Sequence, residues 1–246
     1  MPLPRGAEQA LQAVRAGEAP PWLINRVVEA LVTAGRYTEA LSLPGPGGGD
    51  EMNRLLVQIN LAEAEYNLGR WDAAWERMRP LDGPAARFGI TRSGMLAQRA
   101  WIAAHQGNAA AARASIDAAR KDELPEPYHP EYFFTLAAVC LAEGRLDLAE
   151  EAAQLGAECA VRPSSGRNAL FLLARVEAAR RRWQSAASLC ARAAAHRYRD
   201  QGGDGLLLWG DALMREQDVD GAERAWRLCL ERDPESESAA QARQRF

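Results

Sequence analysis

The chain has 246 residues, of which 48% are apolar and 7% aromatic, and its formal net charge at pH 7 is −3. One lysine and three histidines leave almost no material for Schiff-base lysines, phosphate-loop lysines or multi-histidine metal sites. The slightly acidic balance provides no overall positive field that would attract nucleic acid or an anionic membrane.

No segment has the composition of a membrane span or of a secretory signal. A spanning helix needs about 20 apolar residues, and the longest mostly apolar run, residues 132–143, is far shorter. The N-terminal segment carries Glu8 and Glu18 and lacks an apolar core behind a basic start. We therefore expect a cytoplasmic chain without a membrane span.

The first predicted element is a short helix over residues 7–16, where Ala10, Leu11 and Val14 recur at helical spacing. Beyond it, one pattern recurs: a Gly is followed five residues later by an Ala. Clear copies are Gly35 to Ala40, Gly69 to Ala74, Gly107 to Ala112 and Gly144 to Ala149, and weaker copies end at Ala186 and Ala222. The six alanines are separated by 34, 38, 37, 37 and 36 residues, which indicates a repeat protein.

The repeated pattern predicts a helix hairpin. Apolar residues at helical spacing precede and follow each copy. A Gly between two helices permits the positive φ that ends the first one, and the Ala lets the second helix approach closely. Residues rich in Pro, Gly and Ser mark loops between hairpins, over residues 43–50, 125–130, 163–166 and 201–205.

These residues resemble the tetratricopeptide repeat (TPR) family, whose pattern is W-x₂-L-G-x₂-Y, then A-x₃-F, then P. The last repeat matches best, with Leu206, Trp209, Gly210, Leu213, Ala222, Trp226 and Pro234. The resemblance implies an all-α, right-handed α-solenoid of about six TPR-like hairpins with a capping helix at each end. Trp71, Trp183, Trp209 and Trp226 are expected to be packing residues.

We interpret residues 1–246 as a single solenoid domain. Its expected parts are an N-terminal cap over residues 1–20, repeats over 21–54, 55–92, 93–129, 130–166, 167–202 and 203–234, and a C-terminal capping helix over 235–246. Pro44 and the glycines of residues 47–49 cut the first repeat short. Its second helix is therefore expected to be poorly formed.

The sequence contains no motif for catalysis, metal binding or nucleotide binding. There is no Gly-x-Ser-x-Gly elbow, no phosphate-binding loop that ends in Gly-Lys and no His-Glu-x-x-His helix. Tyr128–Glu131 is interpreted as a turn that starts the fourth hairpin, and residues 202–205 as a linker. We predict no enzyme, no catalytic or metal-binding residue and no cofactor.

The family resemblance implies that the first helix of each hairpin lines a concave groove. Counting back from each Gly gives a fifth-position column of Asn25, Ile59, Ala97, Phe134, Phe171 and Leu207, and a ninth-position column of Glu29, Glu63, Trp101, Ala138, Arg175 and Asp211. The expected partner-binding groove comprises Asn25, Glu29, Ile59, Asn60, Glu63, Trp101, Phe134, Phe171, Arg175, Leu207 and Asp211. Packing between first helices is an equally open interpretation of Ile59, Phe134 and Phe171.

The expected function is a non-catalytic protein–protein interaction module, an adaptor, chaperone or scaffold that binds a peptide or helix of a partner. The family's clamp for a terminal carboxylate is not expected, because Glu29 replaces an Asn and no Lys is in place. The alternative is a regulatory or nucleic-acid-binding module that uses the arginines between Arg175 and Arg199. Nucleic acid is the less favoured partner, and the oligomeric state stays open.

Overall fold

The computed structural model describes residues 6–45, 51–119, 121, 124, 126–160, 163–195 and 203–246. Within them the regular secondary structure is helical, and six successive helix pairs make up most of it. The pairs are α2 (Pro21–Thr33) with α3 (Tyr37–Ser42), α4 (Glu51–Asn67) with α5 (Trp71–Met78), α7 (Gly89–His105) with α8 (Ala109–Ala118), α9 (His129–Ala142) with α10 (Leu146–Glu158), α11 (Pro163–Ala179) with α12 (Trp183–Ala194), and α13 (Gly203–Arg215) with α14 (Val219–Arg232).

A helix lies at each end of this array, α1 (Ala7–Arg15) and α15 (Glu237–Arg243). Three short helices complete the described chain: η1 (Arg79–Leu81), α6 (Asp82–Ala85) and η3 (Glu126–Tyr128). Each hairpin packs against its neighbours in sequence, as in a solenoid. The predicted all-α solenoid of helix hairpins with a helix at each end is confirmed.

The six repeated alanines lie where the paired helices pack. Each is completely buried, with an exposed fraction of 0%: Ala40, Ala74, Ala112, Ala149, Ala186 and Ala222. A larger side chain at any of them would separate the helices, because protein interiors are close-packed. The period read from the sequence therefore marks completely buried positions of the fold.

The turn inside each hairpin uses one residue with positive φ. Gly35, Gly69, Gly107 and Gly144 have φ between 71° and 75°, which ends the first helix as the sequence predicts. The last two hairpins make the same turn with Arg181 at φ 61° and Gln217 at φ 66°. These side chains occupy a conformation that costs an L-residue about 1–2 kcal/mol.

Apolar burial is divided into local clusters along the array. One joins α1 to α4 around Leu31 and Tyr37, and another joins α13 to α15 around Leu206 and Trp226. Trp71, Trp183 and Trp209 pack at the edges of such clusters, so all four predicted packing tryptophans contact core residues. Each cluster depends mainly on adjacent hairpins, which is how repeat proteins gain stability.

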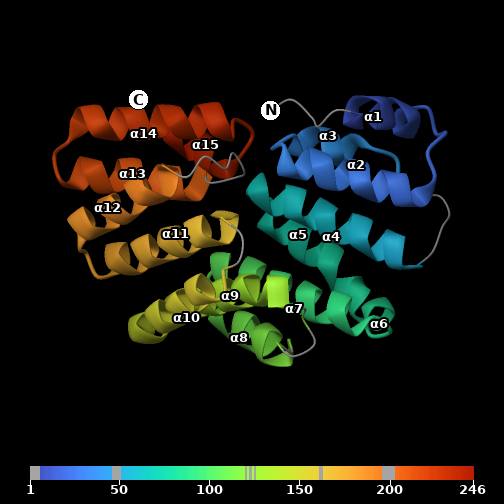
Figure 1. The fold of residues 1–246 in the computed structure, drawn as a ribbon, viewed down its shortest axis with the longest axis horizontal. Coiled ribbons are helices and arrows are strands. Elements are labelled where there is room, and N and C mark those ends of the chain that lie inside the picture. Colours follow the sequence, from blue (N-terminus) through green and yellow to red (C-terminus); the bar gives the residue numbers. More distant parts are fainter. Residues whose placement is uncertain are drawn as a thin grey trace.

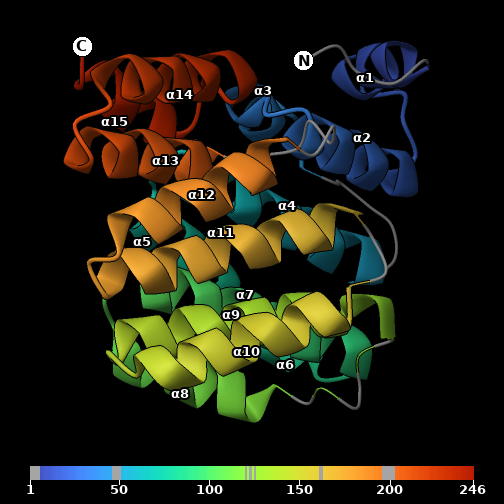
Figure 2. The same cartoon turned by 60° about the vertical axis from the view of Figure 1, so that its left-hand side comes forward.

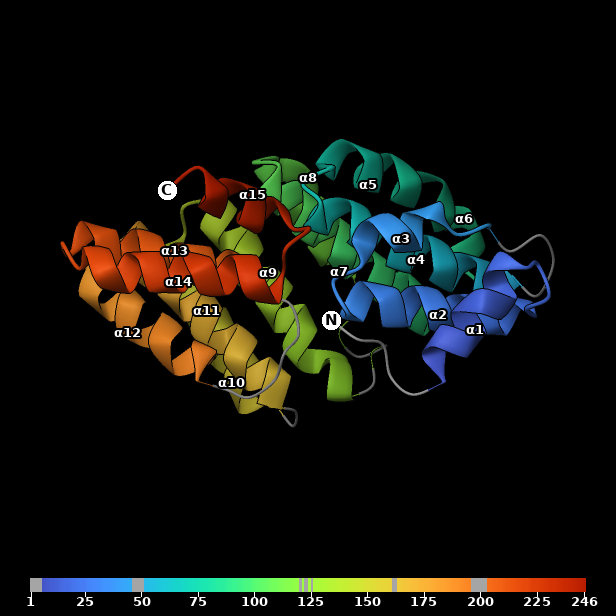
Figure 3. The same cartoon turned by 90° about the horizontal axis from the view of Figure 1, so that it is seen from above.

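The array curves until its two ends meet. Figure 1 shows α1–α3 and α13–α15 at the same end of the molecule, with α7–α10 at the opposite end. The turned view in Figure 2 and the view from above in Figure 3 show the same approach of the ends. We call α1–α6 the N-terminal arm and α11–α15 the C-terminal arm.

Several predicted limits differ from the observed helices. Helices α4, α7 and α11 begin at residues 51, 89 and 163, so the limits expected at 54/55, 92/93 and 166/167 fall inside helices. Each of the three has 17 residues, against 13 in α2, and a constant offset from the Gly ignores this difference. Residues 163–166, expected to be a loop, form the first turn of α11, because Pro is well suited to a first helical position. Of the loop expected over 201–205, residues 203–205 form the first turn of α13, and residues 201 and 202 lie outside the described part of the chain.

Candidate functional site

Two predicted site residues at the start of the array form a polar pair. Asn60 Nδ2 on α4 donates a hydrogen bond to Asn25 Oδ1 on α2 at 3.1 Å. Glu63, one turn further along α4, lies near Glu29, and burial together with the Glu29 charge raises the pKa of Glu63 to about 7. Glu29 itself is exposed and pairs with Arg26 at 3.1 Å. The predicted residues Asn25, Glu29, Asn60 and Glu63 are thus brought together.

Trp101 and Arg175 meet through a histidine that the sequence analysis did not select. His105 lies one helical turn after Trp101 on α7, and the two ring centroids are 4.4 Å apart. Arg175 Nη1 on α11 donates a hydrogen bond to His105 Nε2 at 3.1 Å. Two predicted residues, one on α7 and one on α11 of the C-terminal arm, therefore converge on His105.

The aromatic stack continues into the N-terminal arm. Trp71 stacks on His105 with ring centroids 5.1 Å apart, and Tyr66 stacks on Trp71 at 5.7 Å. The interplanar angles are 10° and 8°, so three rings are nearly parallel. We call Tyr66, Trp71, Trp101, His105 and Arg175 the central cluster; all five side chains keep part of their surface accessible.

The surroundings of the central cluster favour neutral side chains. Burial, reinforced by the charge of Arg175, lowers the pKa of His105 to about 4. Burial raises the pKa of Tyr66 well above its usual value, helped by the charges of Glu63 and Asp204. Burial also lowers the pKa of Arg175, and the charge of Asp204 on α13 opposes this. Arg175 is therefore a cation in a desolvated place.

The predicted apolar groove residues pack inside the array. Phe134 has an exposed fraction of 4%, and its ring occupies the space beside Gly156 on α10. Phe171 lies in the same way against Gly205 on α13. Ile59 and Leu207 pack against core clusters. Of the two interpretations left open for Phe134 and Phe171, the structure favours packing between helices over a ligand-facing seam.

Asp211, the last predicted groove residue, forms an ion pair with Arg245 at 3.1 Å, at the C-terminal end of the chain. Three members of the central cluster were not predicted as site residues: Tyr66, Trp71 and His105. Nor were two residues beside the cluster, Gln98 and Asp204. The i, i+4 spacing of Trp101 and His105 on one helix was the available signal, because such residues share a face. Tyr66 and Asp204 are brought near by the curvature of the array, which the repeat pattern does not encode.

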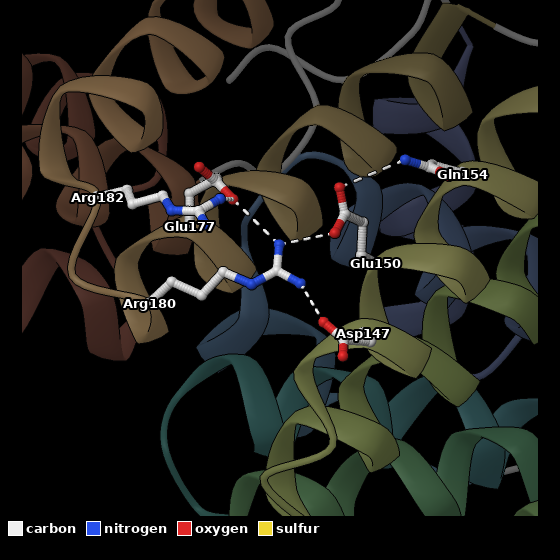
Figure 4. A network of polar contacts seen from close by, with 6 residues as sticks. All are labelled: Asp147, Glu150, Gln154, Glu177, Arg180 and Arg182. Atoms are coloured by element: carbon white, nitrogen blue, oxygen red, sulfur yellow. Dashed lines mark hydrogen bonds and ion pairs between the residues drawn. The ribbon is translucent and has the colours of Figure 1, made fainter.

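Two of the described arginines between Arg175 and Arg192 are engaged by other side chains, namely Arg175 and Arg180. Figure 4 shows Arg180 between carboxylates of α10 and α11. Its guanidinium lies 2.6 Å from both Asp147 and Glu150 and 3.3 Å from Glu177, which also pairs with Arg182 at 3.4 Å. Arg175 belongs to the central cluster, and Arg197 and Arg199 lie outside the described residues. Arg180 is thus already matched by acid groups.

Three other reactive groups of the described chain, His129, Cys190 and Cys229, are engaged or shielded. His129 Nε2 donates a hydrogen bond to the Leu124 carbonyl at 2.9 Å, and burial raises the pKa of Cys190 and Cys229 to about 12. In the part of the chain that the structure describes, no group of His, Cys, Asp and Glu has the arrangement of a metal site. The described helices also include none that is long and apolar enough to cross a membrane.

Comparisons with known proteins place the molecule among helix-hairpin solenoids. No protein-family model and no curated protein matches the sequence. A tetratricopeptide repeat protein from Parabacteroides merdae is similar in structure, with a TM-score of 0.57 and 15% identity over 92% of this chain and 85% of that chain.

Two further solved structures are less similar. Yeast Tom70 has a TM-score of 0.48 and 11% identity over 97% of this chain and 57% of that chain. The C-terminal part of a TPR repeat-containing protein from Cytophaga hutchinsonii has a TM-score of 0.41 and 16% identity over 96% and 92%. The similarity to the Parabacteroides merdae protein shows that the chain has the fold of a tetratricopeptide repeat solenoid, so the resemblance seen in its sequence is confirmed at the level of the fold.

Proposed function

We propose that this chain is a non-catalytic interaction scaffold that binds a segment of a partner protein at the central cluster. The observation that carries the proposal is Arg175, whose one polar partner among the described residues is His105. Other partly buried arginines have carboxylates: Arg113 pairs with Glu143 at 2.7 Å, and Arg77 with Glu65 at 2.6 Å. Asp204 acts on Arg175 through its charge, but among the described residues no carboxylate forms a direct ion pair with the Arg175 guanidinium. Because a desolvated cation without a directly paired anion is costly, an acidic group of a partner would complete the contacts of Arg175.

The rings beside Arg175 suit a protein partner. Tyr66, Trp71 and Trp101 offer large, rigid and partly accessible surfaces, and Trp, Tyr and Arg carry much of the binding energy in protein interfaces. Aromatic side chains add contact area at little cost in conformational entropy. The cluster combines one cation with flat apolar faces, and this suits a segment that carries an acidic residue beside an apolar one.

The geometry of His105 supports a binding role over a catalytic one. Its Nδ1 lies 2.9 Å from the Trp101 carbonyl and its Nε2 accepts from Arg175, so both ring nitrogens are engaged. A general base needs a free nitrogen that points at the reacting proton. Such a scaffold would act as an adaptor, a chaperone or an assembly platform for its partner.

Binding measured with matched arginine variants tests this proposal. The wild-type chain, Arg175→Gln and Arg180→Gln are immobilised, and proteins captured from a lysate are identified by mass spectrometry. We expect Arg175→Gln to lose a partner that the wild type and Arg180→Gln retain, because Arg180 already has three carboxylates. Circular dichroism controls for folding. Equal capture of every protein by all three would show that the central cluster is not the binding site.

A further inference from the structure

Residues 233–237, which connect α14 to the first residue of α15, lie across the first two hairpins. Glu235 accepts a hydrogen bond from the Thr38 backbone N–H at 2.8 Å, and Glu237 accepts one from Trp71 Nε1 at 2.9 Å. These partners are 197 and 166 residues apart in sequence. They join the two ends of the curved array that Figure 1 shows side by side.

The contact repeats from one hairpin to the next. Tyr37 and Trp71 occupy equivalent positions, each two residues after the glycine of its turn. A Cβ atom placed on Gly35 would lie 3.3 Å from Asp233 Oδ1, and one placed on Gly69 would lie 2.9 Å from Glu237 Cδ. One carboxylate therefore lies against each Gly turn, beside the aromatic residue that follows it.

Charge and spacing suit this arrangement. The segment Asp233-Pro234-Glu235-Ser236-Glu237 carries three acidic residues at every second position. The receiving turns provide the backbone N–H of Thr38 and the indole N–H of Trp71, with Arg70 in the second turn. Arg36 in the first turn pairs with Glu8 and Glu39. Donors and carboxylates form strong hydrogen bonds, so the turns of hairpins 1 and 2 form a surface that is complementary to an acidic segment.

The contact has little apolar support. The apolar cluster of the N-terminal arm ends at α4, and the cluster around Trp226 contains residues of the C-terminal arm alone. Glu235 is exposed. Asp233 is buried beside Tyr37 and Ser236, so its carboxylate is desolvated at this contact. A contact made of a few polar groups, one of them a desolvated carboxylate, opens more readily than an apolar interface.

We propose that the turns Gly35–Thr38 and Gly69–Trp71 form a binding surface for acidic peptide segments, and that residues 233–237 of the same chain occupy this surface reversibly. The occupied state closes the array into a ring. An acidic segment presented in trans takes the same place when the chain's own segment leaves it. This surface is separate from Arg175, although Trp71 belongs to both.

The test uses the full-length chain with Glu235→Ala and Glu237→Ala combined. Glu216→Ala with Glu231→Ala is the matched control, because these two glutamates lie exposed on the same arm. Hydrogen exchange measured by mass spectrometry follows the Thr38 amide. We expect exchange there to be about tenfold faster in the Glu235/Glu237 variant, together with a larger radius of gyration in solution scattering, and no change in the control. If the double variant loses helical circular dichroism, Glu235→Ala alone replaces it.

A synthetic peptide of residues 233–246 tests recognition in trans. We call the Glu235→Ala/Glu237→Ala variant the opened variant. We expect the peptide to bind it about tenfold more tightly than the wild type, whose own segment competes at high effective concentration. Trp71→Phe added to the opened variant removes the indole donor and should lower the affinity for the peptide. Unchanged Thr38 exchange in the opened variant, no peptide binding to it, or equal binding to wild type and opened variant would each overturn the proposal.

Discussion

Arg175 fixes the tautomer of His105. Because a guanidinium donates and cannot accept, the hydrogen bond from Arg175 Nη1 to His105 Nε2 requires an unprotonated Nε2. Nδ1 then carries the proton and donates it to the Trp101 carbonyl at 2.9 Å. A contact across 70 residues thus holds a neutral imidazole between two tryptophan rings.

The first prediction concerns the protonation of His105. Its pKa in the folded chain is lowered to about 4, so the folded state binds fewer protons than the unfolded state between about pH 4 and 6.5. The contribution of His105 to stability is therefore complete above pH 6.5 and is lost as the pH falls toward 4. In an NMR titration, the His105 ring should show the Nδ1–H tautomer at pH 7 and a midpoint near pH 4.

Arg175→Gln provides the matched comparison for this titration. Removing the adjacent cation should move the His105 midpoint upward, toward its ordinary value, although burial still opposes protonation. A midpoint near 6.5 in the wild-type chain would contradict the geometry of the central cluster.

The second prediction concerns Asp233, whose effect on stability changes with pH in the direction opposite to that of His105. Burial raises the pKa of Asp233 to about 6, and Asp204 and Glu235 add to this while Tyr37 and Ser236 oppose it. The folded state therefore binds more protons than the unfolded state between about pH 4 and 6, so the cost of burying this carboxylate is present above pH 6 and disappears as the pH falls.

Asp233→Asn removes that cost. We expect the variant to be more stable than the wild type at pH 7 by about 1–3 kcal/mol, and the difference to vanish near pH 4. Urea unfolding at pH 7, 5.5 and 4 measures it. A variant that is less stable than the wild type at pH 7 would mean that the charged carboxylate is well solvated or paired at this place.

The features that could be predicted from the sequence are those set by local physics. Ala149 and Gly144 are five residues apart because one turn joins two helices that must approach closely, and this spacing recurs wherever the chain repeats the hairpin. The period, the turns and the small residues at the helix crossings follow from short-range geometry. Arg181 and Gln217 show that the backbone keeps the turn even where Gly is replaced.

The candidate site depends on geometry between hairpins. Trp101 and Arg175 were predicted from their position in a repeat. His105 follows Trp101 by one turn of α7, and Trp71 comes from the neighbouring hairpin. Arg175 and Asp204 join them because the array curves. Phe134 and Phe171 were assigned to the same face by a constant offset, whereas both lie against glycines of neighbouring helices. The rotation between adjacent hairpins decides whether such a side chain faces the groove or packs against a neighbouring helix. This rotation results from the side chains packed at each junction.

The third prediction tests the strained turn of the last hairpin. Gln217 is exposed and has φ 66°, so Gln217→Gly should raise the free energy of unfolding by about 0.5–1 kcal/mol. Relief of the left-handed conformation outweighs the extra freedom of Gly in the unfolded chain. Gly144→Ala is the opposite substitution in an equivalent turn, because it places a side chain at a residue with positive φ. It should lower the free energy of unfolding by about 1–2 kcal/mol. Thermal unfolding of both variants measures the pair, and a destabilising Gln217→Gly would contradict this explanation of the turn.

The fourth prediction separates two glycines that both lie in helices. A Cβ atom on Gly205 would clash with the Phe171 ring, whereas one on Gly166 would meet open space. Gly205→Ala should therefore cost about 1–3 kcal/mol through overpacking. Gly166→Ala should stabilise the chain by about 0.5–1 kcal/mol, because Ala favours a helix. Chemical denaturation of the two variants checks the difference. If Gly205→Ala were as stable as Gly166→Ala, the ring of Phe171 would have to lie elsewhere, and the face that it leaves would again be open to a partner.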